Sequence, residues 1–196
     1  MKKTIFTIPG FGDKVSEPQY KWMKSFFERN GFRVRPVPIL WNYRVMSDYV
    51  DEFEKYYRKH KTAKNYVLGF SFGAMIAFIS AQKILPDKLY LCSLSPYFKE
   101  DLHTLKPYWE RLIGSHRLQD FQKFTAKKIG KALTVTTTIF YGEREAKKYP
   151  QIKVRCRETA RYIKNANLVV VEDAPHRIDH PNYIQAIKMR FVQNKL

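Results

Sequence analysis

Residues 67–73 constrain the fold of this chain more than any other stretch, because they read VLGFSFG and contain the pattern GxSxG. An apolar run leads into the pattern, and small and apolar residues follow it at 74–78. This order predicts a strand, a sharp turn with Ser71 at its apex, and a helix. The glycines are needed because a Cβ at Gly69 or Gly73 would collide with neighbouring backbone. The pattern also fits a glycine-rich turn without chemical function, so Ser71 needs partners elsewhere in the chain.

Strand-like and helix-like segments alternate along almost the whole chain. Apolar or β-branched runs occupy residues 4–8, 32–40, 65–70, 88–95, 134–141 and 168–171. This alternation predicts an α/β fold in which right-handed crossovers build a mostly parallel six-stranded sheet with helices on both faces. Pro36 and Pro38 confine the second strand to an edge of the sheet or shorten it, because proline cannot donate to the ladder.

The length and the cysteines limit the class of protein. The chain has 196 residues, of which 44% are hydrophobic, so we expect one core and a single domain over residues 1–196. Cys92 and Cys156 both lie in apolar patterns, where cysteine acts as a small buried side chain. Neither a disulfide framework nor a zinc-binding spacing is present, and we expect no metal and no cofactor.

No membrane span is predicted, because no run of about 18 apolar residues occurs. The apolar run at the start of the chain ends at Pro9 and Gly10, which makes it shorter than the core of a signal peptide. A soluble protein of the cytoplasm is the simplest expectation.

The chain is strongly basic, with 36 Lys and Arg against 18 Asp and Glu and a formal net charge of +18. The basic residues are dispersed, with short clusters only at residues 58–61, 127–128 and 147–148. A basic tail or a helix-length basic stripe would indicate nucleic-acid binding, and neither occurs. We therefore expect weak attraction to polyanions but no specific nucleic-acid partner.

One segment interrupts the alternation. The insertion, defined here as residues 97–132, is longer than a single crossover requires and is rich in aromatic residues. Within it, residues 118–128 have the pattern of a helix. The insertion fits either a pair of ordinary packing helices or a short helical cap that gives Ser71 an apolar wall.

Chemically useful residues follow several of the predicted strands. Ligands of open α/β sheets bind beyond the carboxyl ends of the strands, so these positions are expected to meet. The third strand ends at Ser71, the fifth is followed by Glu143 and Glu145, and the sixth is followed by His176. A serine, an acid and a histidine therefore occur at three strand ends. Asp173 and Asp179 are weaker candidates for the acid, because they lie within three residues of His176.

These motifs resemble those of the α/β-hydrolase superfamily, and the resemblance covers nearly the whole chain. It implies a minimal form of that fold without the first two strands. It also implies that Ser71 is the nucleophile of the GxSxG elbow, that Glu145, three residues after Gly142, is the acid, and that His176 is the histidine. The family's HGxG loop is matched by residues 9–12, with Pro9 in place of the histidine.

The chemistry that follows is serine hydrolysis. A neutral serine hydroxyl is a poor nucleophile, so His176 has to accept its proton while Glu145 orients the imidazole, with Glu143 as a rival. The backbone amides of Phe11 and Phe72 are the expected oxyanion donors. We expect cleavage of a carboxylic ester or thioester of a small substrate through an acyl-serine. Acyl transfer with the same residues, and a non-catalytic binding role on this scaffold, remain alternatives.

The expected partner is a small acyl compound, and the oligomeric state stays open. Aromatic side chains near the expected crevice are the candidates for contact with the substrate: Phe70, Tyr97, Phe98 and Trp109. Arg144 and Arg177 flank the proposed acid and histidine. If these arginines face the crevice, they favour an anionic substrate, whereas arginines that face solvent have no bearing on specificity.

Overall fold

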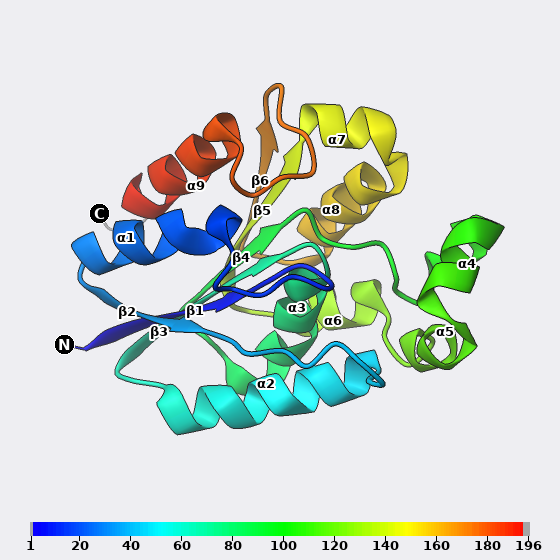
Figure 1. Cartoon of the computed structure of the whole chain (residues 1–196), viewed down its shortest axis with the longest axis horizontal. Helices are drawn as coiled ribbons and strands as arrows, with labels where there is room; N and C mark the ends of the chain where they lie inside the picture. Colours follow the sequence, from blue (N-terminus) through cyan, green and yellow to red (C-terminus); the bar gives the residue numbers. More distant parts are fainter. Residues whose placement is uncertain (1, 194–196) are drawn as a thin grey trace.

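The computed structural model describes residues 2–193 and contains one sheet of six parallel strands (Figure 1). The strand order is β2-β1-β3-β4-β5-β6. The strands are β1 (Lys3–Ile8), β2 (Phe32–Pro36), β3 (Lys64–Phe70), β4 (Lys88–Cys92), β5 (Thr136–Gly142) and β6 (Ala166–Val171). The predicted α/β architecture is confirmed, and β3 lies inside the sheet between β1 and β4.

Helices cover both faces of the sheet and form two apolar cores (Figure 1). On one face α1 (Lys21–Arg29) and α9 (Pro181–Gln193) pack together, with the Phe27 and Phe191 rings 4.9 Å apart. The other face carries α2 (Met46–His60), α3 (Phe72–Ile84), α6 (Ala126–Ala132) and α8 (Pro150–Tyr162). Nearly every side chain of α3 is buried, as its small and apolar composition requires.

The second strand lies at an edge of the sheet, as the prolines predicted, and is shorter than residues 32–40. Regular pairing with β1 ends where Thr7 lies opposite Pro36. One more ladder bond follows, in which the Val37 amide donates to the carbonyl oxygen of Thr7 over 2.9 Å. The chain then leaves the sheet.

The insertion contains a 3₁₀ turn, η2 (Leu102–Thr104), and the helices α4 (Pro107–Ile113), α5 (Ser115–Phe121) and α6. Figure 1 shows α4 and α5 standing away from the sheet, beyond α6. The prediction of one helix over residues 118–128 is wrong, because a turn at residues 122–125 separates α5 from α6. Asp120 joins α5 to the start of α2 by accepting hydrogen bonds from the amide and the hydroxyl of Ser47.

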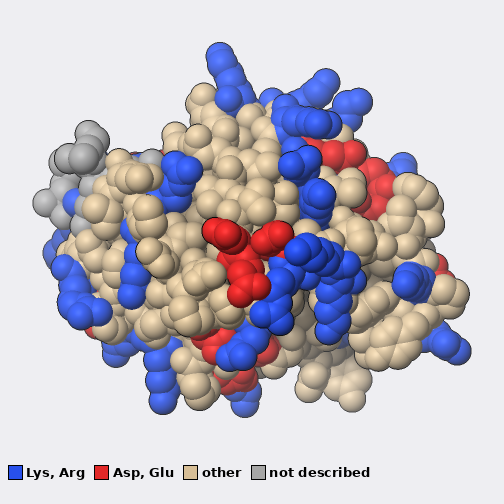
Figure 2. Space-filling view, turned by 90° about the horizontal axis from the view of Figure 1, so that it is seen from above, with Lys and Arg blue, Asp and Glu red and all other residues tan. Residues whose placement is uncertain are grey.

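Two further expectations concern the dispersed surface charge and the absence of a membrane-spanning helix. On the face in Figure 2, Lys and Arg side chains are spread around the molecule, and acidic side chains lie among them. The dispersed charge of the sequence is therefore also dispersed in space on this face. Within residues 2–193, no helix has the length and apolar composition needed to cross a membrane.

Candidate active site

Ser71 lies on a strained turn between β3 and α3. Its φ is 54° and its ψ is −117°, a conformation that residues with a Cβ rarely adopt. A Cβ on Gly69 would lie 2.3 Å from the Gly73 carbonyl oxygen, and one on Gly73 would lie 2.3 Å from that of Pro9. The predicted need for both glycines is confirmed. The turn directs the Ser71 hydroxyl away from the core and into a cavity.

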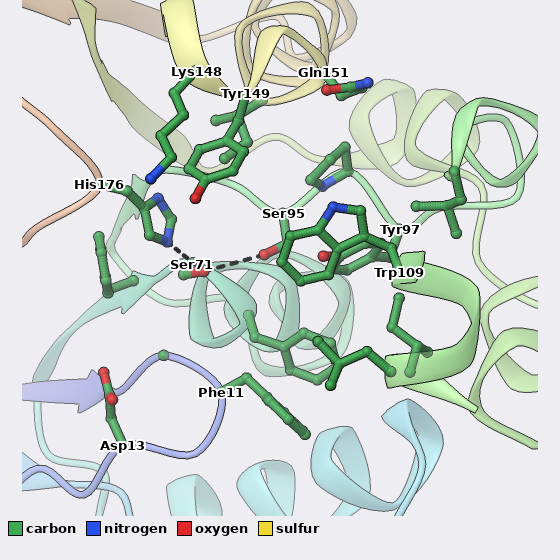
Figure 3. A pocket seen from close by; sticks show the side chains of 18 of the residues that line it. Phe11, Asp13, Ser71, Ser95, Tyr97, Trp109, Lys148, Tyr149, Gln151 and His176 are labelled. Atoms are coloured by element: carbon green, nitrogen blue, oxygen red, sulfur yellow. Dashed lines mark hydrogen bonds between the residues drawn. The ribbon is translucent and has the colours of Figure 1, made fainter. Parts of the chain in front are cut away.

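Ser71, His176 and Glu145 form a chain of hydrogen bonds across three strand ends. The Oγ atom of Ser71 lies 3.1 Å from Nε2 of His176 (Figure 3). The other ring nitrogen, Nδ1, is hydrogen bonded to Oε1 of Glu145. Because a carboxylate oxygen accepts, Nδ1 carries the proton and Nε2 is left free to accept the proton of Ser71.

Glu145 is held rigidly beneath His176. It lies in the first turn of α7 (Glu143–Lys148), a short helix that the sequence did not predict, and the residue is only 1% exposed. The Gly142 amide donates to its Oε2 over 2.8 Å, which closes the first turn of the helix. A buried carboxylate needs such donors, since water cannot reach it.

The rival acids point elsewhere. Glu143 is partly exposed, accepts the Asp173 amide over 3.3 Å and pairs with Lys147 over 3.1 Å. The amide of Asp173 and the ammonium group of Lys147 hold the pKa of Glu143 below its usual range. Asp179 is paired with Arg177 over 2.7 Å. The structure therefore brings Glu145, and neither Glu143 nor Asp179, to the imidazole of His176.

The hydroxyl groups of Ser93 and Tyr183, which the sequence reasoning missed, are buried and hold the carboxylate of Glu145 in place. Ser93 follows β4 with a φ of 55°, and its hydroxyl donates to Oε2 of Glu145 over 2.9 Å. The Tyr183 hydroxyl lies 2.8 Å from the Ser93 oxygen and donates to it, because the Ser93 hydrogen is already used. Burial raises the pKa of Tyr183 well above its usual value, so the phenol keeps its proton. The sequence prediction placed Ser93 inside a strand over residues 88–95, whereas β4 ends at Cys92 and leaves Ser93 in the following turn.

The loop after β1, which carries Phe11, lies beside the start of α3. Phe72 is the first residue of α3, so its amide has no acceptor within the helix. The rings of Phe11 and Phe72 are in contact, with centroids 5.3 Å apart. Tyr20 shapes the loop: its hydroxyl accepts the Gly10 amide over 2.9 Å and donates to Asp13 Oδ2 over 2.6 Å.

A cavity of about 790 Å³ opens above Ser71. Three of the candidates for contact with a substrate, Phe70, Tyr97 and Trp109, are among its lining residues. The Phe70 ring also packs on the imidazole of His176, with centroids 4.9 Å apart. Tyr97 and Trp109 come from the insertion, which therefore supplies an apolar wall (Figure 3).

Phe98 does not line the cavity, and the expectation that it contacts the substrate is wrong for this structure. Its side chain is fully buried in the core, 5.8 Å from the Phe78 ring and 5.4 Å from the guanidinium of Arg155. Its neighbour Tyr97 faces the cavity. Phe98 begins a turn, in which its amide donates to Asp101 Oδ2 over 3.0 Å and the Asp101 amide donates to its carbonyl oxygen over 2.7 Å. The ring of Phe98 enters the core at this turn.

Ser95, Lys148 and Tyr149 are among the side chains that line the cavity without having been predicted. The Ser95 hydroxyl lies 3.4 Å from Oγ of Ser71. Tyr149 follows α7, with its ring centroid 6.2 Å from that of His176, and Lys148 lies beside it. In Figure 3 the Tyr149 hydroxyl points toward Ser71. Their only signal in the sequence was their place shortly after the fourth and fifth strands.

Arg144 and Arg177 do not present free charges to the cavity. Arg144 lies 3.8 Å from the carboxylate of Asp173 at the surface. Arg177 lines the cavity, but Asp179 neutralises it. Within residues 2–193, no three His, Cys, Asp or Glu side chains are grouped as metal ligands would be.

Comparisons with known proteins identify the fold. No protein-family model and no curated protein sequence matches the chain. Among solved structures, Est1E from Butyrivibrio proteoclasticus is similar with a TM-score of 0.80 and 15% identity, over 98% of this chain and 88% of that one. Mouse alpha/beta hydrolase domain-containing protein 10 gives 0.76 and 10%, over 97% and 88%. A carboxylesterase from Nitrososphaera gargenis gives 0.73 and 14%, over 98% and 90%. The protein therefore has the α/β-hydrolase fold.

Proposed function

We propose that this protein is a serine hydrolase that cleaves a carboxylic ester or thioester of a small substrate through an acyl-serine at Ser71. The observation that carries the proposal is the chain of hydrogen bonds from Ser71 through His176 to the buried carboxylate of Glu145. A buried acid on Nδ1 makes Nε2 the acceptor for the proton of the nucleophile. The cavity above Ser71 provides room for the substrate.

Acylation begins when Oγ of Ser71 attacks the carbonyl carbon and His176 Nε2 takes the hydroxyl proton. The carbonyl electron pair moves to the oxygen, which the amides of Phe11 and Phe72 stabilise. Glu145 stabilises the imidazolium that forms. The carbon–oxygen or carbon–sulfur bond then breaks, and His176 gives its proton to the departing alcohol or thiol.

Deacylation repeats these steps with water. His176 takes a proton from the water molecule as its oxygen attacks the acyl carbon. The bond from that carbon to Oγ of Ser71 breaks, and Oγ recovers a proton from His176. The products are a carboxylic acid and free enzyme.

The similar structures support the class of reaction. Est1E was also solved with ferulic acid bound, and the Nitrososphaera gargenis protein is described as a carboxylesterase. At identities of 14 to 15%, these structures show a shared fold and nothing about the reaction. The proposal therefore rests on the arrangement of Ser71, His176 and Glu145.

Labelling with a fluorophosphonate probe tests the proposal. The probe forms a phosphorus–oxygen bond to an activated serine and releases fluoride, and mass spectrometry locates the modified residue. We expect modification of Ser71, and we expect Ser71→Ala to lower hydrolysis of p-nitrophenyl esters by at least about 1,000-fold. Ser25→Ala, at an exposed position of α1, is the matched control.

Folded protein that leaves Ser71 unmodified at high probe concentration and neutral pH would contradict the proposal. A competing alcohol or hydroxylamine distinguishes hydrolysis from acyl transfer. If the added nucleophile takes most of the acyl group at low concentration, the enzyme is an acyltransferase.

A further inference from the structure

Basic side chains in the wall of the cavity differ in whether a carboxylate balances their charge. Arg177 donates to both carboxylate oxygens of Asp179, over 3.1 and 2.7 Å. Arg117 donates to the main-chain carbonyl oxygens of Arg44 and Trp41, and its guanidinium lies 5.2 Å from the Phe11 ring centroid. The charge of Arg177 is therefore balanced by Asp179, whereas Arg117 is fixed against main-chain carbonyl oxygens and the Phe11 ring.

Two lysines also line the cavity: Lys106 lies at the start of α4 on the side of the insertion, whereas Lys148 lies on the side of His176. Lys148 ends α7, and within residues 2–193 its ammonium group forms no ion pair. Nζ lies 5.2 Å from the centre of the Tyr149 ring, a cation–π contact that holds the side chain over the cavity. Figure 3 shows the amine directed to the side of the cavity where Tyr149 and His176 lie. The adjacent Lys147 is instead paired with Glu143 over 3.1 Å.

The proposed reaction indicates which part of the substrate occupies the side of the cavity next to His176 and Lys148. In the proposed reaction, His176 protonates the departing alcohol or thiol, so the leaving group has to lie next to Nε2. The insertion lines the other side with the apolar side chains of Tyr97, Trp109 and Ile113. The acyl group therefore fits against the insertion, and the leaving group fits between His176 and Lys148.

The carboxylate of Asp13 favours the same placement of an anionic substrate. This carboxylate also lines the cavity, and Figure 3 places it across Ser71 from Lys148. The Tyr20 hydroxyl donates to Asp13 over 2.6 Å, but this bond brings no positive charge. An anionic group is repelled on the Asp13 side and attracted on the Lys148 side.

We propose that the cavity selects esters or thioesters whose leaving alcohol or thiol carries an anionic group, and that Lys148 binds this group. The inference rests on the proposed function and adds the class of substrate to it. Lys148 would determine which substrates bind and would take no part in bond breaking, because it contacts the leaving group at a distance from the bond that breaks.

Two esters with the same acyl group test the inference. One is 4-(butyryloxy)benzoate, whose leaving group carries a carboxylate, and the other is 4-(butyryloxy)benzamide, its neutral analogue. The measured quantity is the ratio of their kcat/KM values, carboxylate over amide, at low ionic strength. Lys148→Met is expected to lower the ratio about three- to ten-fold, the range between an exposed ion pair and a hydrogen bond to a charged group.

Lys147→Met is the matched control, because it removes the same charge from the neighbouring position outside the cavity, and the ratio should not change. Equal ratios in these two variants would overturn the inference. A fall of the ratio in Lys106→Met, at the start of α4, with none in Lys148→Met would also overturn it, since the anion would then lie on the acyl side.

A binding measurement separates this inference from the proposed function. Calorimetric titration of Ser71→Ala protein with 4-hydroxybenzoate measures the anion site without catalysis. Binding that weakens several-fold on adding Lys148→Met, but not on adding Lys147→Met, supports the site even if neither ester is hydrolysed. Equal affinity in all three proteins contradicts it, even if Ser71 is an active nucleophile.

Discussion

Replacing Ser93 by alanine tests the buried hydroxyls that support Glu145. Ser93 is fully buried, and its oxygen connects Tyr183 at 2.8 Å with the Glu145 carboxylate at 2.9 Å. Alanine keeps the Cβ, so the cost of the positive φ is nearly the same in both proteins. The substitution therefore removes one hydroxyl and little else.

The structure sets the size of the effect. A hydrogen bond to a charged group contributes about 1.5–3 kcal/mol, and the Tyr183 hydroxyl would be left buried without an acceptor at a cost of about 1–3 kcal/mol. Allowing for relaxation, Ser93→Ala should lower the free energy of unfolding by about 2–4 kcal/mol. Oε2 of Glu145 would keep only the Gly142 amide. The looser carboxylate should lower kcat/KM for ester hydrolysis about 10- to 100-fold.

A double-mutant cycle with Tyr183→Phe isolates the connection between the hydroxyls. The phenylalanine removes the phenol that Ser93→Ala leaves unpaired, so the double variant should be at least about 1 kcal/mol more stable than the two single changes predict. Urea denaturation of the four proteins measures this coupling, and the rate of fluorophosphonate labelling reports the reactivity of Ser71. Additive stabilities, or wild-type labelling by Ser93→Ala, would refute the reasoning.

Three further predictions concern pH, thiols and the serine turn. Burial alone would raise the pKa of Asp120, but hydrogen bonds from Lys123 and Ser47 outweigh burial and lower the pKa. The ionised Asp120 therefore stabilises the fold above about pH 3.9, and this stabilisation is lost as the pH falls. Asp120→Asn should flatten the acid limb of a plot of unfolding free energy against pH. Burial raises the pKa of Cys92 and Cys156, so neither thiol should react with a disulfide reagent at pH 8 until the protein is unfolded. Gly73→Ala should prevent folding, because its Cβ would lie 2.3 Å from a backbone oxygen. Gly10→Ala should fold with a normal circular dichroism spectrum, because the nearest atom to its Cβ is Oδ2 of the Asp13 side chain at 3.2 Å, which can shift slightly.

Patterns within single segments were sufficient to predict most of the fold. Residues 67–73 predicted the strand, the turn and the helix around Ser71, because the glycine spacing and the apolar run are both local properties. The alternation of segments predicted the parallel sheet, since short crossovers leave few other arrangements. The edge position of β2 followed from Pro36 and Pro38, which cannot take part in central pairing.

The local patterns did not decide which neighbouring residue faces the site. Glu143 and Glu145 are two residues apart, but only Glu145 turns inward from α7 to reach His176. Tyr97 faces the cavity while the adjacent Phe98 is fully buried in the core. Such choices depend on helix starts and backbone direction at segment ends, which are the features that sequence patterns locate least well.

By itself, the sequence determined the class of fold, the serine on its turn and the histidine after the last strand, because each of these depends on a few neighbouring residues. Only the tertiary structure decided that Ser93 and Tyr183 support Glu145. It also decided that Arg144 and Arg177 are paired, whereas Lys148 forms no ion pair with any residue from 2 to 193. Ser93 and Tyr183 are 90 residues apart in the chain. Contacts of this kind come from strand order and helix packing, which bring together groups that no spacing in the sequence connects.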